Sequence, residues 1–236
     1  PQEVGRSRVA PGSFSALIVA YYQSTNFRAL KDISQRVYRQ TLERLRSKHG
    51  SKPIRLMLPR HVRAIMDEHA DHPSVANQYL KVLRVLFRFG VDRDFVTRDP
   101  TTGVRNMRTR DTGGIREWTE DELKRFEMYY PLGTRERLIY ALTLYTAQRR
   151  RDVVRLGRQH ERDNGLAIEI RQSKTMTTLR IPIVPPLREA IDAGPCGDVA
   201  YLVTEFGSPF TAAGLGNWFR DAVRGANLNG LSLHGL

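Results

Sequence analysis

The chain contains 236 residues, of which 40% are hydrophobic and 27% charged, and it carries a formal net charge of +13 at pH 7. This length suits one large or two modest globular domains, and the single cysteine, Cys196, excludes an internal disulfide framework and a zinc cluster built from cysteines. Because no apolar run reaches membrane-spanning length and residues 1–12 hold no signal-peptide core, we expect a cytoplasmic protein that does not bind membranes.

The positive charge is concentrated in the first half of the chain. Residues 1–115 contain 21 Lys+Arg against 10 Asp+Glu, whereas residues 116–236 contain 17 against 15. A basic excess confined to one half is typical of a module that binds a polyanion such as DNA. The alternatives are a solubilising surface and, less well supported, an anionic membrane, because no segment combines basic residues with a bulky apolar face.

Apolar spacing and helix caps predict four helices in the first half, after a flexible tail over residues 1–12. These helices span residues 14–23, 33–48, 61–70 and 74–91. Ser13 is a suitable cap for the first, Gly50 ends the second, and Pro59 suits the first turn of the third. Three apolar residues of the second helix should share one side: Val37, Leu42 and Leu45.

The fourth helix has an apolar side and a basic side. The apolar side comprises Tyr79, Val82, Leu83, Leu86 and Phe87. On the other side, Asn77, Lys81, Arg84 and Arg88 recur at helical spacing and form one stripe that suits contacts with phosphates and base edges. A solvated face is the alternative, and the basic excess of this half of the chain favours DNA.

The second half begins after a charged, glycine-rich stretch at residues 108–117, which indicates an interdomain linker. Thr119 and Glu122 form a capping box before an amphipathic helix. Alternating apolar residues then predict an antiparallel hairpin. The remaining predicted elements are helices over 135–145, 185–193 and 211–226, and strands over 165–172 and 178–184. The predicted fold class is therefore mainly α with a small antiparallel sheet.

Motifs for common metal and nucleotide sites are absent. The sequence has no phosphate-binding glycine loop, no HExxH or CxxC pattern, and no histidine or carboxylate spacing that suggests a metal site. A protein of this composition that acts on DNA phosphates would use cationic side chains. We therefore expect neither a cofactor nor a metal.

Three features could supply such chemistry. Arg149, in TAQRRRD, could donate to two phosphate oxygens, with Asp152 one turn later as support. Lys174, one of only six lysines, stands in the hairpin and could give a proton to a leaving alkoxide. His234, in SLHGL, could bind phosphate or accept a proton. Each also has an ordinary interpretation, as a basic run, a solvated turn lysine and a structural histidine.

The order of these motifs behind a basic helical half resembles the tyrosine recombinase (phage integrase) family. The resemblance implies a helical core DNA-binding domain over 13–110, a linker over 111–117 and a mixed α/β catalytic domain over 118–236. It assigns phosphate binding to Arg149 with Asp152 as its support, protonation of the leaving 5′ oxygen to Lys174, and phosphate binding with acid–base work to His234. Ala147 departs from the glycine that is common at its position in the family.

The resemblance implies a site-specific recombinase or integrase of a bacterial mobile element, associated with the nucleoid. Such an enzyme binds double-stranded attachment sites as a homotetramer on synapsed DNA and forms a 3′-phosphotyrosine. In the family a second arginine and the nucleophilic tyrosine follow the histidine motif, whereas all nine tyrosines here precede His234. We therefore expect the chain as given to lack its nucleophile and to be inactive alone. The alternatives are a non-catalytic DNA-binding protein with this fold and a strand-relaxing, topoisomerase-like enzyme.

Overall fold

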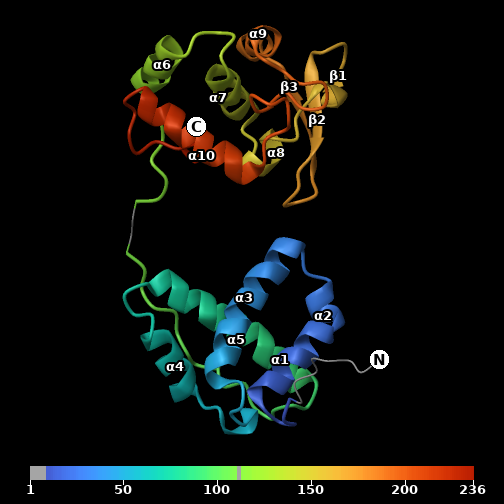
Figure 1. Ribbon diagram of the computed structural model, residues 1–236, viewed down its shortest axis with the longest axis vertical. Coiled ribbons are helices and arrows are strands. Elements are labelled where there is room, and N and C mark those ends of the chain that lie inside the picture. The colour runs from blue at the N-terminus through green and yellow to red at the C-terminus, as the bar shows by residue number, and fades with distance from the viewer. Residues whose placement is uncertain (1–8, 111–112) are drawn as a thin grey trace. The chain divides into compact units, whose positions relative to one another are not determined.

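The computed structural model describes residues 9–110 and 113–236 (Figure 1). Most of the predicted tail, and residues 111 and 112 of the predicted linker, lie outside these residues. The chain divides into two compact units, Pro1–Arg110 and Asp111–Leu236, which we call the N-terminal and C-terminal units. Among the described residues, none of the helices combines the length and apolar character that crossing a lipid bilayer requires.

The N-terminal unit is helical. Its elements are α1 (Phe14–Gln23), α2 (Thr25–Arg28), α3 (Asp32–His49), the 3-10 helix η1 (Ile54–Leu56), α4 (Pro59–Asp67) and α5 (Pro73–Asp92). The hydroxyl of Ser13 caps α1 by accepting from the amide of Ala16 at 3.2 Å, as predicted. Gly50 follows α3, where a side chain would collide with the carbonyl of Arg46. The four predicted helices are thus present, and α2 and η1 are additions too short for a periodic signal.

Helix α5 supplies much of the core of the N-terminal unit. Its predicted apolar side is buried, with Val82, Leu83, Leu86 and Phe87 fully enclosed. Helix α3 differs from the expectation, because Val37 is 38% exposed while Leu42 and Leu45 are buried. The side of α3 that packs in the core runs through the second half of the helix, so Val37 lies at the edge of the interface.

The C-terminal unit combines helices with a small sheet. Its elements are α6 (Glu120–Tyr129), α7 (Arg135–Thr146), α8 (Arg150–Val153), η2 (Arg158–His160), β1 (Glu161–Arg162), β2 (Ala167–Arg171), β3 (Thr178–Pro182), α9 (Pro185–Ala193), α10 (Ala212–Gly225) and η3 (Leu233–Gly235). The strands form an antiparallel sheet in the order β1-β2-β3, with Ile168 opposite Ile181. The mainly helical fold class with a small antiparallel sheet is confirmed. Strand β1 was not predicted, because two residues carry no alternating pattern.

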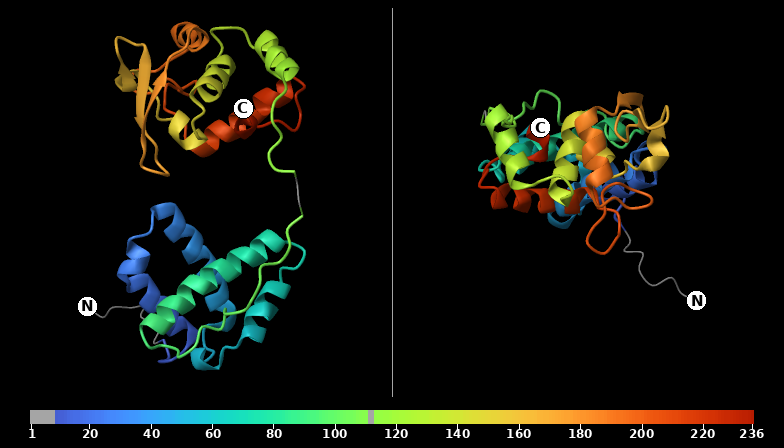
Figure 2. Two further views of the ribbon diagram at one scale, coloured as in Figure 1. Left: turned by 180° about the vertical axis from the view of Figure 1, so that it is seen from behind. Right: turned by 90° about the horizontal axis from the view of Figure 1, so that it is seen from above.

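The core of the C-terminal unit is built round α7. This helix lies between the sheet and α9 on one side and α6 and α10 on the other (Figure 2). Thr119 and Glu122 form the predicted capping box of α6, with both hydrogen bonds present. In this core the ring of Phe126 stacks on that of Tyr140, with centroids 5.3 Å apart, and lies tilted against that of Phe219, with centroids 5.4 Å apart.

Trp118 joins the beginning of the C-terminal unit to its last residues. Its indole Nε1 donates to the carbonyl of Ser232 at 2.9 Å, and its backbone amide donates to the carbonyl of Gly235 at 3.1 Å. A side chain at Gly235 would collide with the carbonyl of Arg116. The segment that carries His234 is therefore fixed against the chain that enters the unit.

Candidate active site

A tight turn between α7 and α8 presents Arg149. Helix α7 ends at Thr146, and Ala147 adopts the left-handed conformation with φ of 50°. The chain then reverses, and Arg149 becomes the residue that precedes α8, with an extended backbone. Its side chain is exposed, and within residues 9–110 and 113–236 its guanidinium has no hydrogen-bond or ion-pair partner. Arg149 therefore occupies the entrance of a helix, with its donors available to an anion.

Asp152 fastens α8 to the β2–β3 loop. Its side chain is fully buried, and its Oδ1 accepts from the backbone amide of Ser173 at 2.8 Å and from Arg155 at 3.3 Å. Its own backbone amide donates to the carbonyl of Arg149 at 2.7 Å. Among the described residues, Oδ2 has no hydrogen-bond partner. Asp152 thus contacts the backbone of Arg149 and the residue before Lys174, and not the Arg149 guanidinium.

A second contact between the α7–α8 turn and the loop is made by two glutamines. Gln148 is only 7% exposed, and its Oε1 accepts from Nε2 of Gln172 at 2.8 Å. Lys174 is exposed on this loop, two residues after Gln172. Neither glutamine is among the residues predicted from the sequence, because nothing in a single sequence links two polar residues 24 positions apart.

His234 lies in η3, where it borders a cleft of about 420 Å³. The cleft is also lined by Arg150 of α8 and by Arg220 and Arg224 of α10. Gly216 of α10 leaves room for the Arg150 guanidinium in this position, since a side chain at residue 216 would force the guanidinium to move. The loop of Lys174 and the segment of His234 therefore both lie against elements that meet at α8. The cleft is strongly cationic, which suits an anionic ligand.

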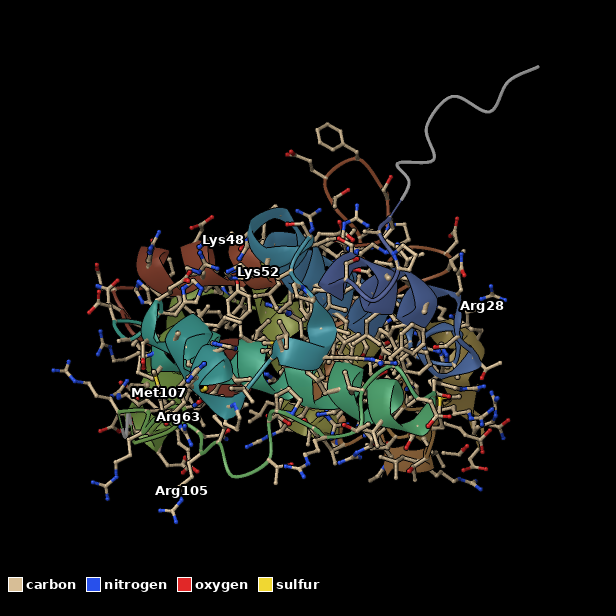
Figure 3. All side chains as sticks on the ribbon, turned by 90° about the horizontal axis from the view of Figure 1, so that it is seen from below. Arg28, Lys48, Lys52, Arg63, Arg105 and Met107 are labelled. Carbon is tan, nitrogen blue, oxygen red and sulfur yellow. The ribbon has the colours of Figure 1, made fainter. Side chains whose placement is uncertain are left out.

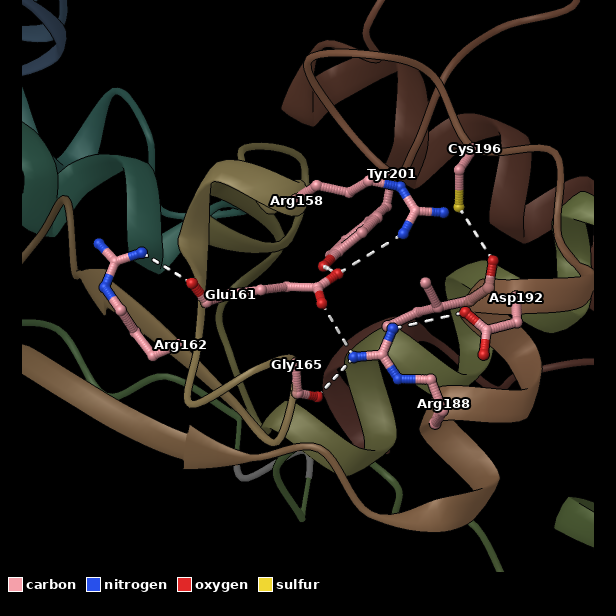
Figure 4. Close-up of polar contacts among 9 residues, drawn as sticks. Arg158, Glu161, Arg162, Gly165, Arg188, Asp192, Cys196 and Tyr201 are labelled. Carbon is pink, nitrogen blue, oxygen red and sulfur yellow. Dashed lines mark hydrogen bonds and ion pairs between the residues drawn. The ribbon is translucent and has the colours of Figure 1, made fainter.

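The buried tyrosines of the C-terminal unit have structural partners. Tyr201 is fully buried, and its hydroxyl donates to Glu161 at 2.5 Å (Figure 4). Glu161 also accepts from Arg188 at 3.0 Å, and Arg188 donates to the carbonyl of Gly165 at 2.5 Å. Burial raises the pKa of Tyr201 and of Tyr140 well above the ordinary range. A phenol held neutral in this way is a poor nucleophile.

In the N-terminal unit the predicted polar stripe of α5 divides into two pairs. Asn77 donates to the carbonyl of Met107 at 2.9 Å and accepts from its amide at 2.7 Å. Arg84 donates to the carbonyl of Val104 at 2.6 Å. These two residues hold the segment that follows α5, whereas Lys81 and Arg88 are exposed.

The exposed side of α5 continues into a groove beside α3. The groove has a volume of about 240 Å³ and is lined by Val37, Gln40, Thr41, Arg44, Ser74, Val75, Gln78 and Tyr79. Gln78 precedes Lys81 by nearly one turn, so the groove and the exposed pair form one surface. Figure 3 shows further basic side chains, Arg28 and Arg105, that project from opposite edges of the unit. The contribution of α3 to this surface is not predicted from the sequence.

Among the described residues, no group of three or more His, Cys, Asp and Glu side chains is arranged to hold a metal ion. The candidate site consists instead of guanidinium, ammonium and imidazole groups around α8. All three kinds of group bind phosphate oxygens, and the ammonium and imidazole groups can also exchange protons.

No protein-family model matches the sequence, and no curated protein matches it. Solved structures do match its fold. A lambda integrase dimer bound to a COC′ core site is similar with a TM-score of 0.81 and 17% identity, over 94% of this chain and 86% of that one. A lambda integrase tetramer bound to a Holliday junction is similar with a TM-score of 0.79 and 18% identity, over 94% of this chain and 70% of that one. The Tn1549 transposon integrase in complex with circular intermediate DNA is similar with a TM-score of 0.72 and 13% identity, over 94% of this chain and 83% of that one. The chain therefore has the fold of the tyrosine recombinases, and the fold that the sequence resemblance predicts is confirmed.

Proposed function

We propose that this protein is a site-specific DNA recombinase of the integrase type, which cleaves and rejoins DNA strands through a 3′-phosphotyrosine. The observation that carries the proposal is the arrangement around α8. Arg149 stands exposed at its start, the loop of Lys174 is fixed to it through Asp152, and His234 lies in the adjoining cationic cleft. The integrase fold, which is similar over 94% of the chain, supports the same reaction.

In the proposed reaction a tyrosine oxygen attacks the scissile phosphorus, and the bond between phosphorus and the 5′ oxygen breaks. His234 accepts the proton of the tyrosine, and Lys174 donates a proton to the departing 5′ oxygen. Arg149 donates two N–H groups to the non-bridging oxygens, where negative charge develops in the transition state. Rejoining is the reverse, with a 5′ hydroxyl as the attacking group.

We propose that the attacking tyrosine is not one of the nine in this chain. Tyr21, Tyr140 and Tyr201 are at most 1% exposed, and the family resemblance places the nucleophile after His234. The 236-residue chain should then bind DNA and form no covalent adduct. A denaturing gel after incubation with a nicked suicide substrate, which traps a cleaved complex, tests this; a covalent band would mean that a tyrosine of this chain serves.

The proposed DNA contacts of the N-terminal unit lie on the surface formed by the α3–α5 groove with Lys81 and Arg88. Arg44, Gln40 and Gln78 supply the donor and acceptor pairs that recognise base edges in the major groove. Lys81 and Arg88 add cations for phosphates. The partners we propose are duplex attachment sites and three further copies of the protein on synapsed DNA, at the nucleoid of a bacterial cell.

The decisive experiment is cleavage by the natural full-length protein carrying Arg149→Ala, with Arg151→Ala as the matched control. Arg151 is also exposed and lies two residues away. Arg149→Ala should reduce cleavage by at least about a hundredfold while DNA affinity changes little, because the lost cation acts mainly in the transition state. Arg151→Ala should cleave normally. Equal losses of binding and cleavage for Arg149→Ala would make Arg149 an ordinary DNA contact. No cleavage by the protein without substitutions would instead favour a non-catalytic DNA-binding protein.

A further inference from the structure

The loop that carries Lys174 is attached to the rest of the protein on both sides of that residue. Before it, the amide of Ser173 donates to the buried carboxylate of Asp152 at 2.8 Å. After it, the hydroxyl of Thr175 donates to Oε1 of Gln172 at 2.8 Å, and Gln172 in turn donates to Gln148. The backbone of Lys174 is thus held from two directions.

The second attachment ends in a rigid part of the fold. Gln148 is 7% exposed, and its Nε2 donates to the carbonyl of Thr146 at 3.0 Å, so both ends of its amide are engaged. Gln148 immediately precedes Arg149 in the chain. A continuous path of hydrogen bonds therefore leads from the residue before Arg149, through Gln172, to the residue after Lys174.

This connection contains no ionised group. Beside a cluster of arginines and Lys174, a carboxylate at position 172 would form an ion pair and draw the ammonium away from a phosphate. An amide pair holds the loop with comparable geometry and adds no negative charge beside the cations. At the loop tip, the side chains of Lys174, Thr175 and Met176 are all exposed.

From these contacts we infer that Gln148 and Gln172 are positioning residues that set the place of the Lys174 ammonium relative to Arg149. Neither glutamine touches the reacting atoms. Together they hold the proton donor at the leaving oxygen while the neighbouring arginine holds the same phosphate. The inference rests on the proposed function and adds to it the hydrogen-bonded glutamine pair that aligns Lys174 with Arg149.

The test is Gln172→Leu in the natural full-length protein, on normal DNA and on DNA whose bridging 5′ oxygen is replaced by sulfur. A thiolate leaves with little need for a proton, since a thiol is far more acidic than an alcohol. Gln172→Leu should slow cleavage of normal DNA by about tenfold to a hundredfold, the size of effect that a small misplacement causes. On the sulfur substrate the loss should be less than about threefold, with unchanged DNA affinity.

Three further variants make the test specific: Gln159→Leu, Gln148→Leu and the double variant Gln148→Leu/Gln172→Leu. Gln159→Leu, at an exposed glutamine of the same unit, should behave as wild type on both substrates. The double variant Gln148→Leu/Gln172→Leu should be no slower than the slower single variant, because both single changes break the same hydrogen bond. Gln172→Leu is the primary variant because Gln172 is only partly buried, so a folding defect of Gln148→Leu does not decide the outcome.

Lys174→Arg separates failure of this inference from failure of the proposed function. It keeps the positive charge but gives up no proton at working pH, and it should be rescued by sulfur. Suppose that the sulfur substrate restores cleavage by Lys174→Arg. If Gln172→Leu then slows cleavage equally on both substrates, or does not slow it on either, the positioning role of the glutamines is wrong. If Lys174→Arg itself is not rescued, Lys174 is not the proton donor and the proposed mechanism fails.

Discussion

The buried carboxylate of Asp152 and the backbone amide of Ser173 lie 2.8 Å apart and join α8 to the β2–β3 loop across 21 residues of sequence. Asp152→Ala should remove this attachment and leave the amide without its partner. We expect the free energy of unfolding to fall by about 1–3 kcal/mol, and hydrogen exchange at the Ser173 amide to accelerate. Asp152→Asn keeps an acceptor oxygen and should retain most of the protection of the Ser173 amide against hydrogen exchange. Equally fast exchange in the wild type would show that this bond is not formed in solution.

The exposed pair on α5 should govern the salt dependence of DNA binding. Lys81→Ala combined with Arg88→Ala should flatten the slope of log affinity against log salt by about 2, one unit for each lost phosphate contact. Arg84→Ala should lower thermal stability instead, because its guanidinium holds the carbonyl of Val104. Titrations at several salt concentrations give the slopes. An unchanged slope for the double variant would assign Lys81 and Arg88 to solvent.

Ala147 is strained by its left-handed backbone, with φ of 50°. Ala147→Gly should relieve a strain of about 1 kcal/mol, offset in part by the greater entropy of the unfolded chain. The net effect should be a stabilisation of about 0.5 kcal/mol in urea unfolding. Ala141→Gly, inside α7, is the control and should destabilise by at least about 1 kcal/mol. A loss of stability for Ala147→Gly would contradict the conformation of the turn.

Glu161 should make the C-terminal unit sensitive to acid. Burial raises the pKa of its carboxyl, but hydrogen bonds from Tyr201 and Arg188 outweigh burial and hold the pKa below its usual value of 4.5. A lowered pKa in the folded state means that the carboxylate stabilises the fold above about pH 4.5 and that this contribution disappears as pH falls through the folded pKa. Glu161→Gln should therefore lower Tm at pH 7 and weaken its decline below pH 4.5. Parallel curves of Tm against pH for the wild type and Glu161→Gln would show that Glu161 does not cause the acid sensitivity.

The sequence predicts the regular elements well where a local signal exists. Ser13 caps α1 and Thr119 with Glu122 caps α6, as the sequence indicates. Turn geometry is also local, so Arg149 could be placed at the entrance to a helix from its neighbours alone.

Contacts between distant segments produce no local signal in the sequence. Asn77 and Arg84 have the same helical spacing as Lys81 and Arg88, and periodicity does not distinguish a side chain that meets solvent from one that meets the segment around Met107. The pairing of Gln148 with Gln172 depends on how the hairpin folds back, which neither local sequence determines.

The hydrogen bonds of Trp118 give the C-terminal unit a mechanical property. Because its indole and its amide hold Ser232 and Gly235, the point where the chain enters the unit is also the point that supports the His234 segment. Tension applied to the chain before Trp118 is therefore borne by the same bonds that keep His234 in place. Force on the incoming chain and the position of the imidazole are coupled through a single tryptophan.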